Sequence, residues 1–445
     1  MLVSNYTQVF SHDDESSAIW HSVFGRPMLV PNILSDHLLN NRSKGLDPEI
    51  EQNFGKEVLD TLAEAHIIID SKEQEQKDID DLFDRHNPAG ANKVKFLSLI
   101  MSEECPFRCT YCIHFANSKH YYNEEKMMSV EVAKTSIDQY FDLIARSGQE
   151  SAYVNFGGGE ALLNYKTIAE VLPYIDARSK ELGIPVRTAL NSNLYLLTEE
   201  MAANFIKYGV EIAASLDGSK EGNDKVRLTK NLTGTYDRIL ENMKIFEKLG
   251  RPLKSFAMTV TEANFFDVDT AIIDWAESQG MNEVRIDIDV VGMVDIPIED
   301  VVERLKKVRA YAKAKGIPVI GFWSRAAENL GLVPEEVDVG FCGGERGHSV
   351  CVAPSGQVFP CGYSNYQIGT YNNLNSIYQE DAYQELLKRR NLNLLEDCKD
   401  CPIYGFCRGG CLITKEANET SEKQKAMCKL YVEMTKAIID ESIDA

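Results

Sequence analysis

The stretch that decides the fold is KFLSLIMSEECPFRCTYC, at residues 95–112. Residues 95–102 form a short and mostly apolar run, which predicts a buried β-strand. Three cysteines follow directly, at Cys105, Cys109 and Cys112. In barrel folds the loops at the carboxyl ends of the strands hold the active site. The stretch therefore predicts a strand that delivers three thiols to a functional site.

Beyond this stretch, short β-like runs alternate with amphipathic helical patterns, which is typical of βα units and a parallel sheet. Because six such units fall short of the eight in a closed barrel, we expect an open, partial (β/α)6 TIM-like barrel within an α/β fold. The sequence PVIGFW at 318–323 is a candidate last strand. The six expected strands are residues 95–102, 152–158, 186–193, 211–218, 253–260 and 284–291.

Length and charge narrow the function classes. The 445 residues suggest about three domains, at roughly 150 residues each. No run approaches the ~20 apolar residues of a membrane-spanning helix, and the N-terminus lacks the features of a secretion signal. The net charge of −21 argues against nucleic acid or an anionic membrane as a partner, since both require a basic face. We expect a cytoplasmic protein.

The eleven cysteines fall into tight groups, at 105–112, 342–361 and 398–411, with Cys428 beyond them. Disulfide frameworks are typical of short secreted chains, so metal ligation in a reducing compartment is the better interpretation here. Three thiolates can bind three irons of a four-iron, four-sulfur cube and leave the fourth iron open to a substrate or cosubstrate.

Zinc is the alternative for the first group. A structural zinc site needs four closed ligands, and no histidine stands at zinc-finger spacing beside the three cysteines. His114 and His120 lie near them in the sequence, however, so the alternative stays open.

The expected strand 284–291 carries Arg285, Asp287 and Asp289 on one face and apolar residues on the other. Parallel strands are usually apolar on both faces. One polar face therefore indicates either a barrel lumen that holds a polar ligand or an internal salt bridge.

The spacing C-x3-C-x2-C, with the aromatic Tyr111 before its last cysteine, resembles that of the radical S-adenosylmethionine (SAM) enzymes. The resemblance implies that Cys105, Cys109 and Cys112 hold a 4Fe–4S cluster whose open iron binds SAM. It places Tyr111 beside the adenine.

Further segments resemble SAM contacts of that family. Gly158, Gly159 and Glu160 match a GGE motif, although Ala161 replaces the usual proline. Residues 192–197, SNLYLL, are similar to a ribose-binding TNGxLL segment, with Leu194 in place of the glycine. The SAM contacts that the resemblance implies are Tyr111, Gly158, Gly159, Glu160, Ser192, Asn193, Ser215 and Arg227, the last two at the SAM carboxylate.

The C-terminal cysteines resemble the SPASM extension, which carries two auxiliary 4Fe–4S clusters. The resemblance assigns Cys342, Cys351, Cys361 and Cys411 to the first cluster, and Cys398, Cys401, Cys407 and Cys428 to the second. Cys351 is the least secure ligand, and without it the first cluster would be open to a substrate thiolate. A run of zinc knuckles is the alternative for these spacings.

The resemblance also implies a reaction and its cofactors: SAM and three 4Fe–4S clusters. The reduced site cluster splits SAM into methionine and a 5′-deoxyadenosyl radical, which takes a hydrogen atom from an unactivated carbon. The auxiliary clusters then accept an electron, and Asp287 or Asp289 could accept a proton. An external donor of the flavodoxin or ferredoxin type would supply electrons.

The N-terminal segment points to the substrate. A hairpin followed by helices resembles the winged-helix-like domain that binds the leader of ribosomally made precursor peptides, where a leader adds as a strand to a sheet edge. The expected division is a recognition domain at 1–75, a linker at 76–93, a radical SAM partial barrel at 94–335 and a SPASM domain at 336–445.

We therefore expect a maturase that installs an intramolecular thioether or carbon–carbon crosslink in a precursor peptide. The first alternative is an anaerobic sulfatase maturase that forms formylglycine from Cys or Ser. A different class is an iron–sulfur electron carrier or redox sensor, which would need no SAM pocket.

Overall fold

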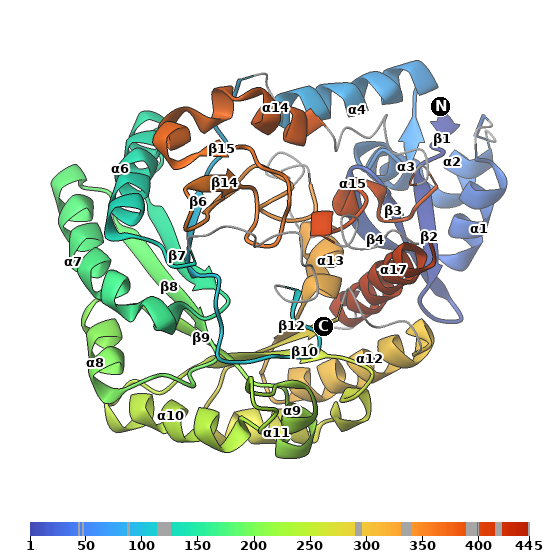
Figure 1. Ribbon diagram of the computed structural model, residues 1–445. Coiled ribbons are helices and arrows are strands. Elements are labelled where there is room, and N and C mark those ends of the chain that lie inside the picture. Colours follow the sequence, from blue (N-terminus) through green and yellow to red (C-terminus); the bar gives the residue numbers. More distant parts are fainter. Residues whose placement is uncertain are drawn as a thin grey trace.

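The computed structural model describes residues 1–42, 45–46, 49–86, 90–113, 126–289, 296–330, 340–388, 398, 400–413 and 421–443. A curved parallel sheet with helices outside it forms the largest part (Figure 1). A small α+β unit from the N-terminus lies on the opposite side of the molecule, and the C-terminal helix α17 (Ser421–Ile443) lies between the two. No helix among these residues is long and apolar enough to cross a membrane.

The parallel strands confirm the expected partial barrel and fall close to the predicted ranges. In β10 and β11 buried and half-buried side chains alternate, as expected for strands with one face against the helices and the other toward the lumen. Neighbouring strands pair in parallel in their order along the chain. They are β6 (Phe96–Ser102), β7 (Ala152–Gly158), β8 (Val186–Ser192), β9 (Glu211–Ser215), β10 (Ser255–Val260), β11 (Glu283–Ile288) and the short β12 (Val319–Ile320).

Amphipathic helices cover the outside of this sheet. Helix α6 begins after Ser129, whose side chain accepts a hydrogen bond from the Val132 amide, and helix α7 ends at Gly183 with a φ of 67°. The helices that follow the strands are α6 (Val130–Arg146), α7 (Tyr165–Leu182), α8 (Glu199–Lys207), α9 (Lys220–Val226), α10 (Tyr236–Lys248), α11 (Ala271–Ser278), α12 (Ile298–Ala314) and α13 (Arg325–Leu330).

The cysteine-rich C-terminal part continues the barrel sheet. Strand β13 (Ser349–Val352) pairs in parallel with β6, so that Cys351 lies opposite Ser98. Strand β14 (Gln357–Phe359) forms an antiparallel hairpin with β13, and Gly356 in its turn has a φ of 82°. Strand β15 (Gly369–Thr370) closes this edge, followed by a 3-10 segment (Tyr371–Gln379) and helix α14 (Asp381–Lys388).

The N-terminal unit is a small α+β structure with its own apolar core. Its antiparallel sheet has the order β2 (Thr7–Ser11), β3 (Ser16–His21), β4 (Gly25–Pro31), and a short pair joins β1 (Leu2–Val3) to β5 (Ile68–Ile69). Three helices complete it: α1 (Asn32–Asn40), α2 (Glu49–Phe54) and α3 (Lys56–Glu64). The hairpin expected in this segment is confirmed as β3–β4.

The expected linker contains regular structure. Residues Lys72–His86 form helix α4, most of which lies within the range 76–93. Its polar and acidic composition favoured a linker, but Ile79, Leu82 and Phe83 repeat at helical spacing and are buried. Burial of this narrow apolar stripe against the turn of the β3–β4 hairpin and Tyr404 explains why the helix forms.

Candidate active site

The first cysteine group lies in the loop that leaves β6, at the carboxyl end of the barrel. The Cys105 Sγ atom accepts hydrogen bonds from the Phe107 amide at 3.4 Å and from Asn193 Nδ2 at 3.6 Å. Burial raises the pKa of the Cys105 thiol to about 12 and that of Cys109 to about 11. Three thiols in one loop fit a cluster that binds thiolates, and such a cluster would replace their protons on binding. His114 and His120, which carried the zinc alternative, lie outside the described residues.

The glycine pair after β7 packs against this loop. A Cβ atom on Gly158, which has a φ of 125°, would stand 2.2 Å from the Ser102 carbonyl oxygen. A Cβ atom on Gly159 would stand 2.7 Å from the Glu104 carbonyl oxygen. Close backbone approach therefore accounts for both glycines. Contact of this backbone with SAM stays a prediction.

Glu160 ties the glycine turn to the end of β8. Its carboxylate accepts hydrogen bonds from Ser192 Oγ at 2.7 Å and from the Asn193 amide at 2.8 Å, and it is 1% exposed. Burial raises its pKa. The two segments that the sequence predicts to bind SAM thus lie side by side, beside Cys105.

The residue that departs from the ribose-binding pattern keeps the backbone shape of a glycine. Leu194 has a φ of 60°, in the left-handed region, and its side chain is fully buried. Asn242 Nδ2 donates to the Leu194 carbonyl oxygen at 2.7 Å and holds the turn. A leucine therefore occupies a backbone conformation that favours glycine.

Arg227 and Tyr111 meet at Asp217, a residue that sequence reasoning did not select. The Asp217 carboxylate accepts a hydrogen bond from the Tyr111 hydroxyl at 2.6 Å and two from Arg227, at 3.0 and 3.1 Å. Burial raises the pKa of Tyr111 well above its usual value, so that its hydroxyl keeps its proton and donates. Ser215, the other predicted carboxylate contact, is half-buried at the end of β9. The only signal in the sequence was the position of Asp217 two residues after Ser215.

On the lumen side of β11 the internal salt bridge is present. Arg285 Nε donates to Asp287 Oδ2 at 2.7 Å, and the Phe322 amide donates to Asp287 Oδ1 at 2.8 Å. The Asp289 amide donates to the Val260 carbonyl oxygen at 2.8 Å, and its side chain is half-buried. Asp287 is therefore held by the Arg285 side chain and the Phe322 amide, whereas its role as a proton acceptor, like that of Asp289, stays a prediction.

The cysteines predicted for the first auxiliary cluster come together beside the barrel. Burial raises the pKa of the Cys361 thiol well above its usual value, and the neighbouring thiols Cys342, Cys411 and Cys351 contribute to the shift. Burial also raises the pKa of Cys351 to about 12, although a hydrogen bond with Ser98 opposes the shift. A Cβ atom on Gly362 would stand 3.3 Å from Cys351 Sγ, which places that thiol against the backbone that follows Cys361.

The cysteines predicted for the second auxiliary cluster lie against the N-terminal unit. Burial raises the pKa of Cys401 to about 11, and the nearby thiols Cys398 and Cys428 contribute. Cys398 and Cys401 pack against an apolar cluster formed by the β3–β4 turn, α4 and Tyr404. Cys407 is buried in helix α15 (Tyr404–Cys407).

Among the residues that the structure describes, no three His, Cys, Asp or Glu side chains converge tightly enough for a single metal ion.

Comparisons with known proteins agree with this site. The model of the Radical SAM superfamily matches residues 99–272, and the SPASM model, an iron–sulfur cluster-binding domain, matches residues 342–402. The chain is 23% identical to the radical SAM cyclopropyl synthase TigE of Paramaledivibacter caminithermalis, over 99% of this chain and 96% of TigE. It is 24% identical to a cysteine-type anaerobic sulfatase-maturating enzyme of Clostridium novyi, over 73% of this chain and 90% of that protein.

Two solved structures share the fold. Native anSMEcpe with bound AdoMet superposes with a TM-score of 0.62 at 18% identity, covering 79% of this chain and all of anSMEcpe. Streptococcus suis SuiB bound to the precursor peptide SuiA superposes with a TM-score of 0.56 at 15% identity, covering 95% of this chain and 98% of SuiB. The chain is therefore a radical SAM enzyme with a SPASM domain, related to the sulfatase maturases, and these domains imply SAM and iron–sulfur clusters as its cofactors.

Proposed function

We propose that the protein is a peptide maturase that installs an intramolecular thioether or carbon–carbon crosslink in a ribosomally made precursor peptide. The observation that carries the proposal is the N-terminal α+β unit, which is docked on the iron–sulfur domain. The similarity to TigE extends over 99% of the chain and so includes this unit. TigE is a cyclopropyl synthase, which favours a carbon–carbon bond over a thioether.

The N-terminal unit offers an edge on which a leader peptide could add as a strand. Strand β4 is an edge of the three-stranded sheet in the described residues, and its Leu29 is 46% exposed. Ile33, at the start of α1, is 71% exposed. Exposed apolar side chains beside a strand at the edge of a sheet are suited to strand addition, where main-chain hydrogen bonds give affinity and side-chain contacts give specificity.

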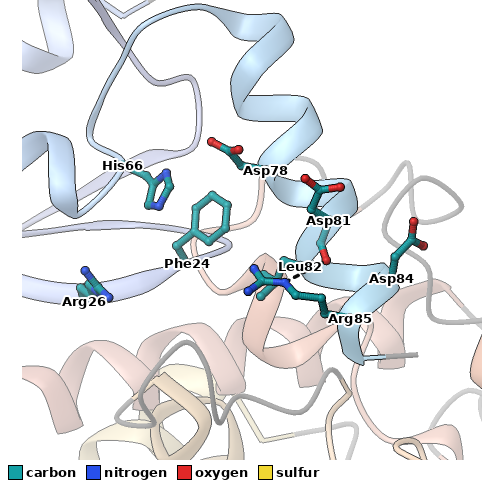
Figure 2. A pocket seen from close by; sticks show the side chains of 8 residues that line it. All are labelled: Phe24, Arg26, His66, Asp78, Asp81, Leu82, Asp84 and Arg85. Atoms are coloured by element: carbon teal, nitrogen blue, oxygen red, sulfur yellow. Dashed lines mark hydrogen bonds between the residues drawn. The ribbon is translucent and has the colours of Figure 1, made fainter. Parts of the chain in front are cut away.

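A cavity of about 680 Å³ opens beside the start of β4 (Figure 2). Phe24 and His66 lie against each other in it, with ring centroids 4.0 Å apart, and Asp78 and Arg85 of α4 face them. Its size and mixed lining suit side chains of a bound peptide segment. Because Phe24 also packs in the apolar cluster beside Cys398, a leader bound here would lie close to the second auxiliary site.

The reaction must remove two hydrogen atoms from the peptide for each new bond. When bound, SAM and its cluster would supply the chemistry that abstracts one hydrogen atom. The second hydrogen would leave as a proton, and the auxiliary clusters would accept the electron that it leaves behind. Among the chain's own residues, we propose Asp287 or Asp289 as the acceptor of that proton; Asp287 is paired with Arg285 in this structure. We propose three 4Fe–4S clusters, held by the eleven cysteines as assigned above, and an external flavodoxin- or ferredoxin-type donor.

The second candidate is a sulfatase maturase that forms formylglycine. The relative from Clostridium novyi supports it, but that similarity extends over only 73% of this chain. An N-terminal recognition unit is the feature that a sulfatase maturase would leave unexplained.

The test is co-production of the protein with a candidate precursor peptide, followed by mass spectrometry. Loss of two hydrogen atoms, with fragmentation blocked between two residues, is the expected result. The Cys105→Ala variant should form no crosslinked product, and removal of the leader should strongly reduce the amount formed. Formylglycine in a sulfatase peptide, with the precursor unchanged, would favour the second candidate instead.

A further inference from the structure

One buried carboxylate joins the cysteine loop to the predicted SAM pocket. Asp217 lies two residues after the end of β9 and is 1% exposed. Its Oδ2 atom accepts from the Tyr111 hydroxyl at 2.6 Å and from Arg227 Nε at 3.1 Å. Its Oδ1 atom accepts from Arg227 Nη2 at 3.0 Å and from the Thr259 amide at 2.9 Å. Four hydrogen bonds thus reach this carboxylate from the cysteine loop, the segment after α9 and strand β10.

We propose that Asp217 is a positioning residue that holds the Arg227 guanidinium and the Tyr111 ring in the arrangement that binds SAM. The proposal rests on the SAM chemistry of the proposed function and extends it to a residue that does not itself touch the cosubstrate. Asp217 acts through its two partners.

The donor geometry of Arg227 supports this role. A guanidinium has five N–H donors in a fixed fork, and Asp217 occupies one on Nε and one on Nη2. The other N–H groups of Arg227 do not contact Asp217. Because the guanidinium is planar and rigid, the two bonds to Asp217 also fix the direction in which these groups point. A carboxylate ligand such as the methionine end of SAM could then be bound by the other side of the fork.

The backbone around Arg227 is fixed independently of Asp217. The Arg227 amide donates to the Asn223 carbonyl oxygen at 2.7 Å, and Thr235 Oγ1 donates to the Arg227 carbonyl oxygen at 2.7 Å. Replacement of the Asp217 carboxylate should therefore release the Arg227 side chain and leave its main chain in place.

The same carboxylate reaches the cluster loop. Tyr111 stands between Cys109 and Cys112, and its ring lies 5.8 Å from the Arg227 guanidinium carbon. Movement of this tyrosine would displace the loop on which both cysteines lie. Asp217 therefore couples the position of the cluster loop to the occupancy of the SAM pocket.

The test uses anaerobically reconstituted full-length protein and the variants Asp217→Asn, Tyr111→Phe and Arg227→Gln. Iron content, thermal unfolding, SAM affinity by calorimetry and the electron paramagnetic resonance spectrum of the reduced site cluster are measured. For Asp217→Asn we expect unchanged iron, SAM affinity at least about tenfold weaker and a smaller spectral change on SAM addition. Tyr111→Phe, which keeps the ion pair, should weaken binding by less.

A double variant separates positioning from general support of the fold. If Asp217 acts through Arg227, Asp217→Asn should change SAM affinity by less than about twofold in the Arg227→Gln background. Equal losses in both backgrounds would overturn the proposal, as would wild-type SAM affinity and spectrum in Asp217→Asn. If Asp217→Asn fails to fold, wild-type affinity and spectrum in Tyr111→Phe would overturn the coupling to the loop.

The matched control is Asp237→Asn, which removes an exposed ion pair with Lys220 in the same part of the barrel. It should leave SAM affinity unchanged. Wild-type protein that does not bind SAM would overturn this proposal together with the proposed function. Wild-type protein that binds SAM but crosslinks no peptide would overturn the proposed function alone.

Discussion

Trp20 of the N-terminal unit donates its indole N–H to the carbonyl oxygen of Pro402, 2.9 Å away. Pro402 follows Cys401 directly, and Trp20 is fully buried. The Gly405 amide adds a second bond from the same segment to the Ser22 carbonyl oxygen, at 2.8 Å. The unit proposed to recognise the peptide is thus fixed to the cysteines proposed for the second auxiliary cluster.

Gly405 is the position at which this docking is most easily disturbed. A Cβ atom there would stand 2.6 Å from the Val23 carbonyl oxygen, which belongs to backbone and cannot move aside cheaply. We expect Gly405→Ala to lower stability by about 1–3 kcal/mol and to speed iron loss to a chelator. Gly45→Ala, which adds a Cβ in the N-terminal unit with nothing within 4 Å, is the control. Equal thermal unfolding of both variants would contradict the docking argument.

Iron content tests the cysteine assignment. Three four-iron clusters predict about twelve irons per reconstituted chain. Cys361→Ala should lower the content by about four. We expect Cys351→Ala to behave alike, because its thiol lies against the backbone after Cys361. If Cys351→Ala keeps about twelve irons, Cys351 is not a ligand and the first auxiliary cluster has a free position.

Replacement by glycine should change stability in different directions at two leucines that share the same strained backbone conformation. Leu194 and Leu232 both have a φ of 60°, but the first is fully buried and the second is 74% exposed. Replacement by glycine relieves about 1–2 kcal/mol of strain at each site. At Leu194 the lost burial costs about 2–5 kcal/mol, so stability should fall, whereas Leu232→Gly should be neutral or stabilising. Denaturant unfolding of the two variants measures the difference.

We expect acidic pH to destabilise the N-terminal unit. Burial lowers the pKa of His21 below its ordinary 6.5, although Glu75, 3.3 Å away, opposes the shift. His21 Nδ1 accepts from the Val23 and Phe24 amides at 3.1 Å, so protonation there would break both bonds. Burial also lowers the pKa of His66.

The two buried histidines make the stability of the protein depend on pH. The unfolded chain binds these protons more readily than the folded one. We therefore expect the free energy of unfolding to be highest above about pH 7 and to fall as the pH drops below the ordinary histidine pKa. Thermal unfolding between pH 7.5 and pH 5.5 measures the slope, which His21→Gln should reduce. A wild-type melting temperature that does not change over this range would contradict the expectation.

The sequence was most informative where one local pattern determined one element. The barrel strands alternate with helices along the chain, so their positions followed from apolar runs. The spacing of Arg285 and Asp287 on one strand face left an internal salt bridge as one of two alternatives, and the structure contains it. Helix α4 was missed because acidic residues outnumber its three buried apolar ones.

Relations between distant segments were not predictable in this way. The pairing of β13 with β6 joins residues that are about 250 positions apart, and the sequence of neither strand indicates which strand it pairs with. Asp217 is similar: its role depends on Tyr111, more than 100 residues away in the chain. Local reasoning therefore found residue types suited to a cofactor but not the carboxylate that arranges them.

The strand pair β6–β13 has a further consequence for electron movement. β6 leads into the loop of Cys105, and β13 carries Cys351, so the two ends of the proposed path between the first auxiliary cluster and the site cluster are attached to one ladder of backbone hydrogen bonds. Tunnelling rates fall exponentially with distance. A rigid ladder keeps that distance constant while peptides of different lengths enter and leave, so the transfer rate would be a property of the backbone and not of the substrate.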